Sequence, residues 1–355
     1  MKYVFLLSGD YPDLAKEEAF SLFEIKNYKI LDRLLIADLN NDEKSLIKLG
    51  KISALTKKIY RSLFQCKLDA LTETMKDFDW SSFYKDNFCL RVHNLSDNGN
   101  KKGKIRKNYS EKELAGYVWN SLHNAKVNLE NPKTLIQLFL INGRAYCGLL
   151  LFQNNENFEL RKSHLRPFPH PSSLHPKAAR ALVNITGIKE AQALLDPFCG
   201  TGGFLIEAGL MGIKTIGYDI NKVMAKGCIE NLKYFKIRNC KVKIKNALHI
   251  NDKFDFAVTD LPYGLNSNAV VKYGKDWKKF RLNKKIQKKD FIGQLEKFYL
   301  SFLKNLRSKL SKKAVIIFPD YVDYKKLLRQ AKFKVEREFK IYVHRSLTRK
   351  IVRVS

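Results

Sequence analysis

Five short runs of apolar residues recur through the second half of the chain, and helical or loop-like segments separate them. The runs cover residues 192–198, 214–220, 241–247, 254–261 and 314–319. Strands that alternate with helices are typical of a parallel sheet with helices on both faces. We therefore predict an α/β fold with a doubly wound sheet in this half. The closing segment, 332–355, contains two strand-like runs with a tight connection, which predicts an antiparallel hairpin at the sheet edge.

The first half of the chain has a different pattern. Residues 1–60 combine strand-like runs with two segments of helical periodicity, which predicts a small α+β domain. Within 61–155, two apolar runs flank Asn142-Gly143-Arg144, and Asn-Gly in such a place favours a β-hairpin. Residues 156–176 contain four prolines. Because the residue before a proline resists helix, we predict an extended linker there, followed by a last domain over 177–355.

The charge of the chain indicates a polyanionic partner. Its 355 residues include 66 Lys and Arg against 35 Asp and Glu, a formal net charge of +31. The 45% of apolar residues can form cores, so the basicity is not a sign of disorder. Net charge is +7 over residues 1–175 and +24 over 176–355. Such a field attracts nucleic acid first and a membrane surface second. A lysine-rich genome composition is the alternative explanation.

A turn that contains glycine follows the first of the five runs, in Asp196-Pro197-Phe198-Cys199-Gly200-Thr201-Gly202-Gly203. Glycine there lets the backbone approach a ligand closely. Asp219 ends the second run, where a carboxylate can accept hydrogen bonds from ribose hydroxyls. Asp196 would repel a diphosphate but suits a cation. The pattern therefore favours S-adenosylmethionine (SAM), which carries a sulfonium, over NAD; a tight turn without a ligand is the alternative.

Asp260, Leu261, Pro262 and Tyr263 lie at the end of the fourth run, at the expected switch point of the sheet. The exocyclic amine of a nucleobase is a poor nucleophile because its lone pair is delocalised into the ring. The carboxylate of Asp260 and the carbonyl of Leu261 can accept its N–H groups, and Tyr263 can stack on the base. Asp260 can also take the proton. We predict that these residues are catalytic; ordinary turn residues are the alternative.

Together these motifs resemble the class I SAM-dependent methyltransferases that act on exocyclic amines, which have a Rossmann-like sheet. Residues 166–184, 196–212 and 344–351 look like those of the archaeal tRNA guanine-N2 methyltransferases that modify position ten. The resemblance covers nearly the whole chain. It implies a ferredoxin-like domain over 1–60, a THUMP RNA-binding domain over 61–155 and the methyltransferase domain over 177–355.

The resemblance also implies site residues. Asp260, Pro262 and Tyr263 would hold the guanine. SAM would lie against the glycine turn and the ends of the second and third runs, at Asp196, Pro197, Cys199, Gly200, Thr201, Gly202, Asp219, Asn246 and Ala247. Two departures stand out. Leu261 replaces the first proline of the common D-P-P-Y, which keeps the backbone carbonyl. Asn246 replaces an Asp that contacts the adenine amine, and its oxygen can still accept a hydrogen bond.

A basic segment follows the catalytic motif. Residues 265–290 carry nine basic and two acidic residues, with three aromatic residues interleaved. Basic and aromatic groups together suit contacts to an RNA backbone and stacking on bases. We therefore predict RNA contacts at Lys278, Lys279 and Arg281, with a solvated helix as the alternative. The resemblance adds Arg345 and Arg349 to this set.

We predict a SAM-dependent tRNA guanine-N2 methyltransferase with tRNA as its partner. The alternatives are an amine methyltransferase acting at another tRNA position, on rRNA guanine or on DNA adenine, and a non-catalytic RNA-binding protein. The six cysteines form no C-x-x-C pair, so no metal site is expected. The start of the chain has no secretion signal, which predicts a cytoplasmic protein without a membrane anchor. We expect a monomer; the number of methyl groups added and the need for a small activating protein stay open.

Overall fold

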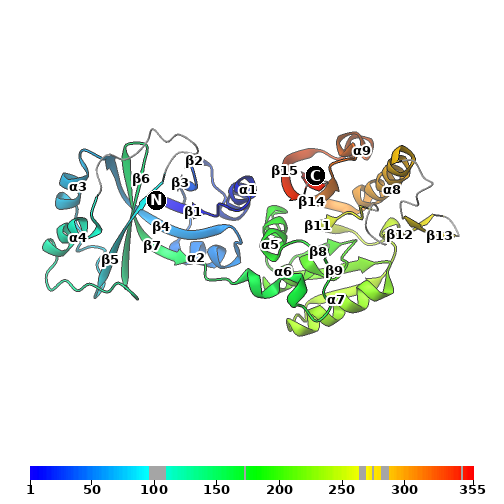
Figure 1. Ribbon diagram of the computed structural model, residues 1–355, viewed down its shortest axis with the longest axis horizontal. Coiled ribbons are helices and arrows are strands. Elements are labelled where there is room, and N and C mark those ends of the chain that lie inside the picture. The colour runs from blue at the N-terminus through cyan, green and yellow to red at the C-terminus, as the bar shows by residue number, and fades with distance from the viewer. Residues whose placement is uncertain (96–108, 172, 264–268, 274–275, 281–287, 345–346) are drawn as a thin grey trace. The chain divides into compact units, whose positions relative to one another are not determined.

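The computed structural model describes residues 1–95, 109–171, 173–263, 269–273, 276–280, 288–344 and 347–355. It divides into two compact units, Met1–Asn155 and Glu156–Ser355, each with its own seven-stranded sheet (Figure 1). Within the described ranges no helix is long and apolar enough to cross a membrane.

The first unit is built on a sheet with the strand order β2-β3-β1-β4-β7-β6-β5. Its strands are β1 (Lys2–Leu7), β2 (Asn27–Leu31), β3 (Leu34–Asp38), β4 (Thr56–Lys67), β5 (Phe88–Asn94), β6 (Thr134–Ile141) and β7 (Arg144–Gln153). Its helices are α1 (Pro12–Phe23), α2 (Glu43–Ile52), α3 (Leu71–Asp77) and α4 (Glu111–Asn120). Asn142 and Gly143 both have positive φ and join β6 to the antiparallel β7, which confirms the predicted hairpin.

The strand β4 joins the two predicted parts of this unit. The first four strands and two helices follow the order β1-α1-β2-β3-α2-β4. Each pair of adjacent strands among these four is antiparallel. β4 is 12 residues long and pairs with β1 on one side and β7 on the other. The predicted boundary between 1–60 and 61–155 therefore lies inside one strand.

The second unit has the strand order β10-β9-β8-β11-β14-β16-β15. Its main strands are β8 (Ala193–Asp196), β9 (Lys214–Asp219), β10 (Cys240–Ile244), β11 (Phe254–Asp260), β14 (Leu310–Pro319), β15 (Val335–His344) and β16 (Leu347–Val354). Its helices are α5 (Pro176–Ile185), α6 (Gly203–Leu210), α7 (Lys222–Tyr234), α8 (Lys288–Lys309) and α9 (Tyr324–Gln330). Three short 3-10 helices are η1 (Phe158–Arg161), η2 (Ser163–Leu165) and η3 (Ala247–His249).

The topology of the second sheet confirms the predicted doubly wound fold. The five apolar runs form β8, β9, β10, β11 and β14, and each pairing between two of these strands is parallel. The chain first builds outward from β8 to β10 and then returns to β11 on the other side of β8, so the strand order reverses between β8 and β11. Ligands of such sheets bind at this switch point, beyond the carboxyl ends of the strands.

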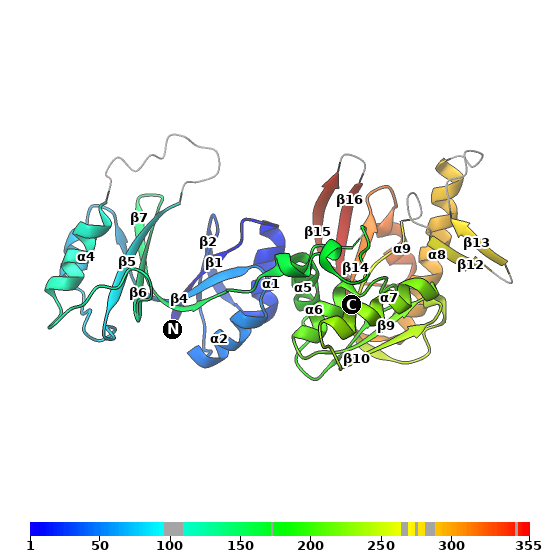
Figure 2. The same ribbon diagram turned by 60° about the horizontal axis from the view of Figure 1, so that its bottom comes forward.

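The predicted C-terminal hairpin is also confirmed. β15 and β16 are antiparallel, and β16 lies between β14 and β15 (Figure 2). β15 is therefore the edge strand, whereas β16 is an inner strand of the sheet. This insertion carries residues from the end of the chain to the carboxyl end of β14, the strand that pairs with β11.

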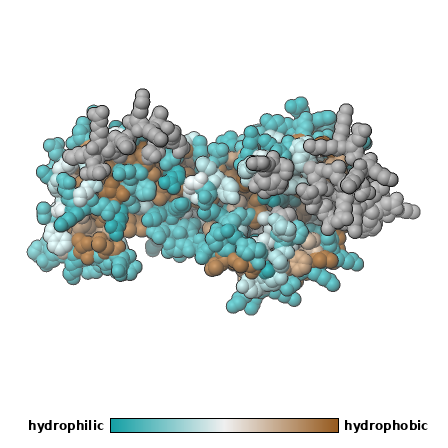
Figure 3. Space-filling view, in the orientation of Figure 1, coloured by the Kyte–Doolittle hydropathy of each residue, from teal (hydrophilic) through white to brown (hydrophobic). Residues whose placement is uncertain are grey.

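The predicted linker packs against the second unit. Asn231 of α7 accepts a hydrogen bond from the Phe168 amide (2.9 Å) and donates one to the Phe168 carbonyl (3.0 Å). A Cβ at Gly227 would lie 2.2 Å from the Phe168 ring, so the ring packs where only glycine leaves room. In the view of Figure 3 most of the described surface is hydrophilic, with scattered apolar patches.

Candidate active site

Three aspartates end neighbouring strands of the second sheet. Asp196 is the last residue of β8, Asp219 of β9 and Asp260 of β11. Because these strands are parallel, their carboxyl ends meet at one edge of the sheet. The charges of Asp219 and Asp260 both raise the pKa of Asp196, so the three carboxyl groups are electrostatically close. The sequence prediction brought these residues together correctly.

Asp196 is the most deeply buried of the three, with 1% of its surface exposed. Its Oδ1 accepts hydrogen bonds from the Phe198 amide and the Thr259 hydroxyl, both at 3.2 Å. Burial raises the pKa of Asp196 to about 8, and the two neighbouring carboxylates add to this rise. The group is therefore poised to lose its proton when a cation binds beside it.

The glycine turn lies between β8 and α6. Gly200 and Gly202 have φ of 50° and 88°, in the left-handed region that favours glycine. A Cβ at Gly202 would lie 2.7 Å from the Cys228 sulfur. The turn is held to β9 because the Cys199 amide donates to the Tyr218 carbonyl at 2.9 Å. The Cys199 side chain packs in an apolar cluster with Leu205 and Cys228, so only its backbone belongs to the turn surface.

The carboxylate of Asp219 is fixed by the backbone. Its Oδ2 accepts from the Gly200 amide (3.0 Å) and its Oδ1 from the Asn221 amide (2.8 Å). A carboxylate has about four lone-pair positions, so each oxygen can still accept a further donor. Burial raises the pKa of Asp219, and the nearby His170 of the linker counteracts part of this rise. Sequence reasoning did not place His170 at this site.

The remaining predicted cofactor residues lie around the same edge. Asn246 follows β10, and its Oδ1 accepts from the Leu248 amide at 2.9 Å, so it caps the short helix η3. Ala247 is buried beside it. Thr201 lies in the glycine turn, with its hydroxyl 3.2 Å from that of Ser173. Pro197 lies between Asp196 and the glycines of the turn.

The backbone of the D-L-P-Y motif is held by three hydrogen bonds. The Leu261 amide donates to the Ile317 carbonyl of β14 at 3.2 Å. Tyr299 of α8 donates its hydroxyl to the Pro262 carbonyl at 2.8 Å, and Tyr321 donates to the Tyr263 carbonyl at 2.6 Å. Both tyrosines were missed by the sequence analysis. Tyr299 looks like an ordinary core residue of an amphipathic helix, and Tyr321 lies in a connection between β14 and α9 without a recognisable motif. They give the motif a fixed backbone.

The Asp260 side chain takes part in a three-residue network. The Tyr263 hydroxyl donates to its Oδ1, and Nη2 of Arg349 lies 3.2 Å from its Oδ2. Nε of Arg349 donates to the Tyr263 hydroxyl oxygen at 3.0 Å. Burial raises the pKa of Asp260, and the charge of Arg349 is the largest influence that lowers it. Arg349, predicted from the resemblance as an RNA contact, is 7% exposed and lies at the catalytic motif.

Of the other four predicted RNA contacts, two lie within the described residues. Lys278 and Lys279 lie on β13 (Asp276–Phe280), which pairs with β12 (Ala269–Tyr273) in a separate two-stranded sheet. The alternative of a solvated helix is thus wrong for these two residues. Arg281 and Arg345 lie outside the described residues.

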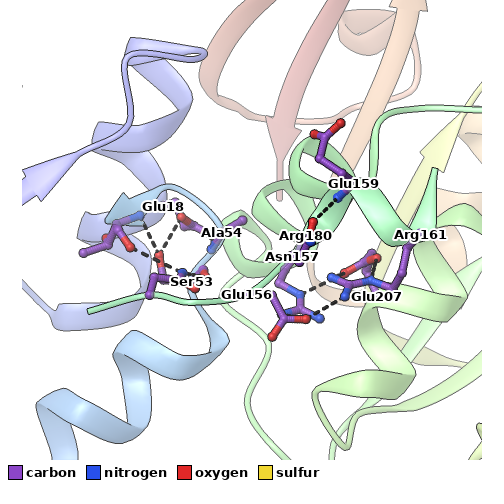
Figure 4. Close-up of polar contacts among 11 residues, drawn as sticks. Glu18, Ser53, Ala54, Glu156, Asn157, Glu159, Arg161, Arg180 and Glu207 are labelled. Atoms are coloured by element: carbon purple, nitrogen blue, oxygen red, sulfur yellow. Dashed lines mark hydrogen bonds and ion pairs between the residues drawn. The ribbon is translucent and has the colours of Figure 1, made fainter. Parts of the chain in front are cut away.

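An ion-pair network fixes the helix that begins at the glycine turn. Glu207 of α6 is fully buried, and its two oxygens bind Arg161 (Nε, 2.8 Å) and Arg180 (Nε, 2.9 Å). Arg161 also contacts Glu156 at 2.6 Å (Figure 4). Both guanidinium groups lie over the Phe158 ring, at 4.9 and 5.1 Å from its centroid. The linker, α5 and α6 are therefore held together behind the turn.

In the described ranges, no group of three or more potential ligands is arranged to hold a metal ion.

Comparison with known proteins adds family information to this geometry. The family described as RMKL-like, methyltransferase domain, matches residues 163–275. A Methanothermobacter thermautotrophicus protein named tRNA (guanine(10)-N2)-dimethyltransferase is 31% identical over 362 residues, covering 100% of this chain and 99% of its own length. A Methanocaldococcus jannaschii protein of the same name is 33% identical, covering 74% of this chain and 82% of its own length.

Solved structures share the fold across both units. TrmN from Thermus thermophilus matches with a TM-score of 0.51 at 15% identity, covering 100% of this chain and 99% of that one. A possible methylase from Clostridium difficile 630 matches with a TM-score of 0.50 at 16% identity, covering 99% and 98%. These likenesses support the Rossmann-like fold of the second unit.

Proposed function

This chain belongs to the family of the tRNA (guanine(10)-N2)-dimethyltransferases, and we propose that it methylates the exocyclic N2 amine of guanosine at position ten of tRNA, with SAM as methyl donor. The observation that carries the proposal is the position of Asp260. It ends the strand beside β8, at the same sheet edge as the glycine turn and as Asp196 and Asp219.

The residues of this edge fit a cationic nucleoside. Asp219 keeps acceptor positions for ribose hydroxyls, because the backbone amides of Gly200 and Asn221 occupy only one position on each oxygen. Asp196 supplies a buried carboxyl group that a cation would ionise. Bound SAM supplies an electrophilic methyl group on a cationic sulfur.

The D-L-P-Y motif presents the amine. Asp260 and the carbonyl of Leu261 accept its N–H groups, which restores lone-pair density on nitrogen and aims it at the methyl group. The carbon–sulfur bond of the donor would break as the new carbon–nitrogen bond forms, which would leave a neutral thioether and a cationic amine. The amine then releases one proton, which Asp260 can take. A monomethylated amine keeps one N–H for Asp260, so we propose two successive transfers, in line with the names of the relatives.

The finer assignments of the first unit are part of the proposal. The order β1-α1-β2-β3-α2-β4 with antiparallel neighbours supports a ferredoxin-like domain, and the rest of the unit would be the THUMP domain. We propose that this unit binds tRNA. A monomeric state and a cytoplasmic location stay predictions, and the need for a small activating protein stays open.

Product analysis tests the proposed function. The wild-type chain is incubated with methyl-labelled SAM and, separately, a tRNA transcript, rRNA and duplex DNA, and the digested nucleosides are separated. We expect label in N2-methylguanosine and N2,N2-dimethylguanosine from tRNA alone. Label in methyladenine from DNA, or guanine label only from rRNA, would favour the corresponding alternative, and SAM binding without any transfer would favour a non-catalytic protein.

The affinity for SAM is expected to depend on pH through Asp196. Its pKa is raised to about 8 in the free protein, and a bound cation favours the carboxylate. Below that pKa, binding must displace the proton, so affinity should rise as pH increases to about 8 and then level off, by at most about tenfold per pH unit. Isothermal titration calorimetry at several pH values measures this. The variant Asp196→Asn should bind SAM more weakly and with an affinity that does not depend on pH over this range. A wild-type affinity for SAM that falls as pH increases to about 8 would contradict the role given to Asp196.

A further inference from the structure

The side chain of Arg349 contacts both polar groups of the catalytic motif. Its Nη2 lies 3.2 Å from Oδ2 of Asp260, and its Nε donates to the Tyr263 hydroxyl oxygen at 3.0 Å. That hydroxyl in turn donates to Oδ1 of Asp260. Since a guanidinium can only donate, the direction of each hydrogen bond is fixed, and the network ends on the carboxylate.

The position of Arg349 in the sheet explains its reach. β16 pairs with β14 so that Arg349 lies opposite Pro319, at the carboxyl end of β14. Its side chain is 9% exposed, whereas that of Asp260 is 22% exposed. The arginine is thus enclosed behind the motif, and the carboxylate keeps an accessible surface. A phosphate of bound RNA would find little of this guanidinium exposed.

The other groups that face Asp260 do not stabilise its negative charge as a cation does. Asp196 of β8 is a like charge when ionised, and the Asp260 charge in turn raises the pKa of Asp196. The Tyr299 hydroxyl of α8 faces the motif but donates to the Pro262 carbonyl. Among the described residues that contact the Asp260 side chain, Tyr263 supplies a neutral donor and Arg349 supplies the positive charge.

We propose that Arg349 is a positioning residue for methyl transfer, which keeps Asp260 ionised and oriented toward the substrate amine while it holds the Tyr263 ring in place. This role rests on the proposed function of the site. The fixed fork of a guanidinium matters, because it reaches the carboxylate and the tyrosine hydroxyl with different nitrogens at once. A lysine at 349 would supply one charged nitrogen and could not hold both partners in the same geometry.

The proposal predicts a pH effect. Asp260 must be ionised to accept the amine, so the rate should fall as pH decreases through its pKa. Without Arg349, only the Tyr263 hydrogen bond opposes the effect of burial, and the pKa of Asp260 rises further. The acidic limb of the pH–rate profile then moves to higher pH, and each unit of movement lowers the rate on that limb about tenfold.

The test compares Arg349→Met with Arg349→Lys and wild type. Single-turnover methyl transfer to a tRNA transcript is measured from about pH 5.5 to about pH 9, together with KM for tRNA and SAM affinity. We expect Arg349→Met to lower the rate of methyl transfer at least about tenfold at neutral pH. The rate should recover at high pH, and SAM affinity should be unchanged. The rate of Arg349→Lys at neutral pH should lie between that of Arg349→Met and that of the wild type. Arg337→Met, at an exposed arginine of the same hairpin, should keep the wild-type profile.

Two results would overturn the proposal. One is a loss that is the same at every pH, which indicates a structural role. The other is an unchanged pH profile with a raised KM for tRNA, which indicates an RNA contact. If Arg349→Met does not fold, Tyr263→Phe replaces it, because this variant keeps the ring but removes the hydroxyl from the network, and it should shift the limb in the same direction. A wild-type protein that methylates no tRNA would contradict the proposed function instead.

Discussion

Replacing Asp260 by alanine is expected to lower the rate of methyl transfer by about a thousandfold or more, while SAM still binds. The change removes the group that accepts the amine N–H and takes the proton. The glycine turn follows β8 and Asp219 ends β9, so their mutual contact does not involve Asp260 and remains in place. Single-turnover transfer to tRNA and calorimetric SAM titration measure the two effects separately.

The isosteric variant Asp260→Asn sharpens this prediction. It keeps one oxygen acceptor and the side-chain shape but loses the negative charge, so its rate should fall between wild type and Asp260→Ala. Loss of SAM binding in Asp260→Ala, with the fold intact, would show that Asp260 serves the cofactor rather than the amine. Because Arg349 loses its ionic partner in both variants, thermal unfolding should be compared before the rates are interpreted.

Replacing Glu207 by alanine is expected to lower the stability of the second unit by about 3–5 kcal/mol. The side chain is fully buried and binds Arg161 and Arg180, so its removal leaves two buried guanidinium groups without their main counter-charge. The glycine turn precedes the same helix, so SAM affinity should fall as well. Urea unfolding followed by a probe in the second unit measures the loss.

A matched control is available in the same network region. Glu159 is exposed and pairs with Lys162 and His175. Exposed ion pairs contribute little to stability, so Glu159→Ala should unfold at nearly the wild-type urea concentration. Equal effects of the two substitutions, or no effect of Glu207→Ala, would contradict the role given to the buried pair.

Periodicity in the sequence was sufficient to predict the second sheet. Alternation of apolar runs with helical segments depends on local burial, and it placed five parallel strands and the closing hairpin correctly. Asp196, Asp219 and Asp260 could be grouped because each ends one of these strands. The motif positions therefore followed from the topology.

Contacts between distant segments could not be predicted in this way. Arg349 meets Tyr263 across 86 positions of sequence, because β16 inserts next to β14. Nothing in the local pattern around Arg349 distinguishes it from an edge-strand charge. Glu207 did carry a local signal, since it is a lone acid within an otherwise apolar helix, which predicts a buried charge that needs a partner. Its partners, however, lie in the linker and in α5.

The first unit shows a second limit of sequence reasoning. The sequence predicts that the first small domain ends at residue 60, because strand-like runs and helical periodicity extend to that point. In the structure α2 ends at Ile52 and β4 runs from Thr56 to Lys67. The strand begins where the Glu18 carboxylate accepts the Ala54 and Leu55 amides, at 2.8 and 2.7 Å (Figure 4). This buried cap comes from α1, so the end of α2 depends on a tertiary contact.

Position mapping of the product tests the central claim most directly. A tRNA transcript is methylated by the wild-type chain with SAM, cut with a ribonuclease and sequenced by mass spectrometry, beside a transcript in which guanosine 10 is replaced by adenosine. We expect one or two methyl groups on guanosine 10 of the first transcript and none on the second. Methylation at another nucleotide, or equal methylation of both transcripts, would contradict it.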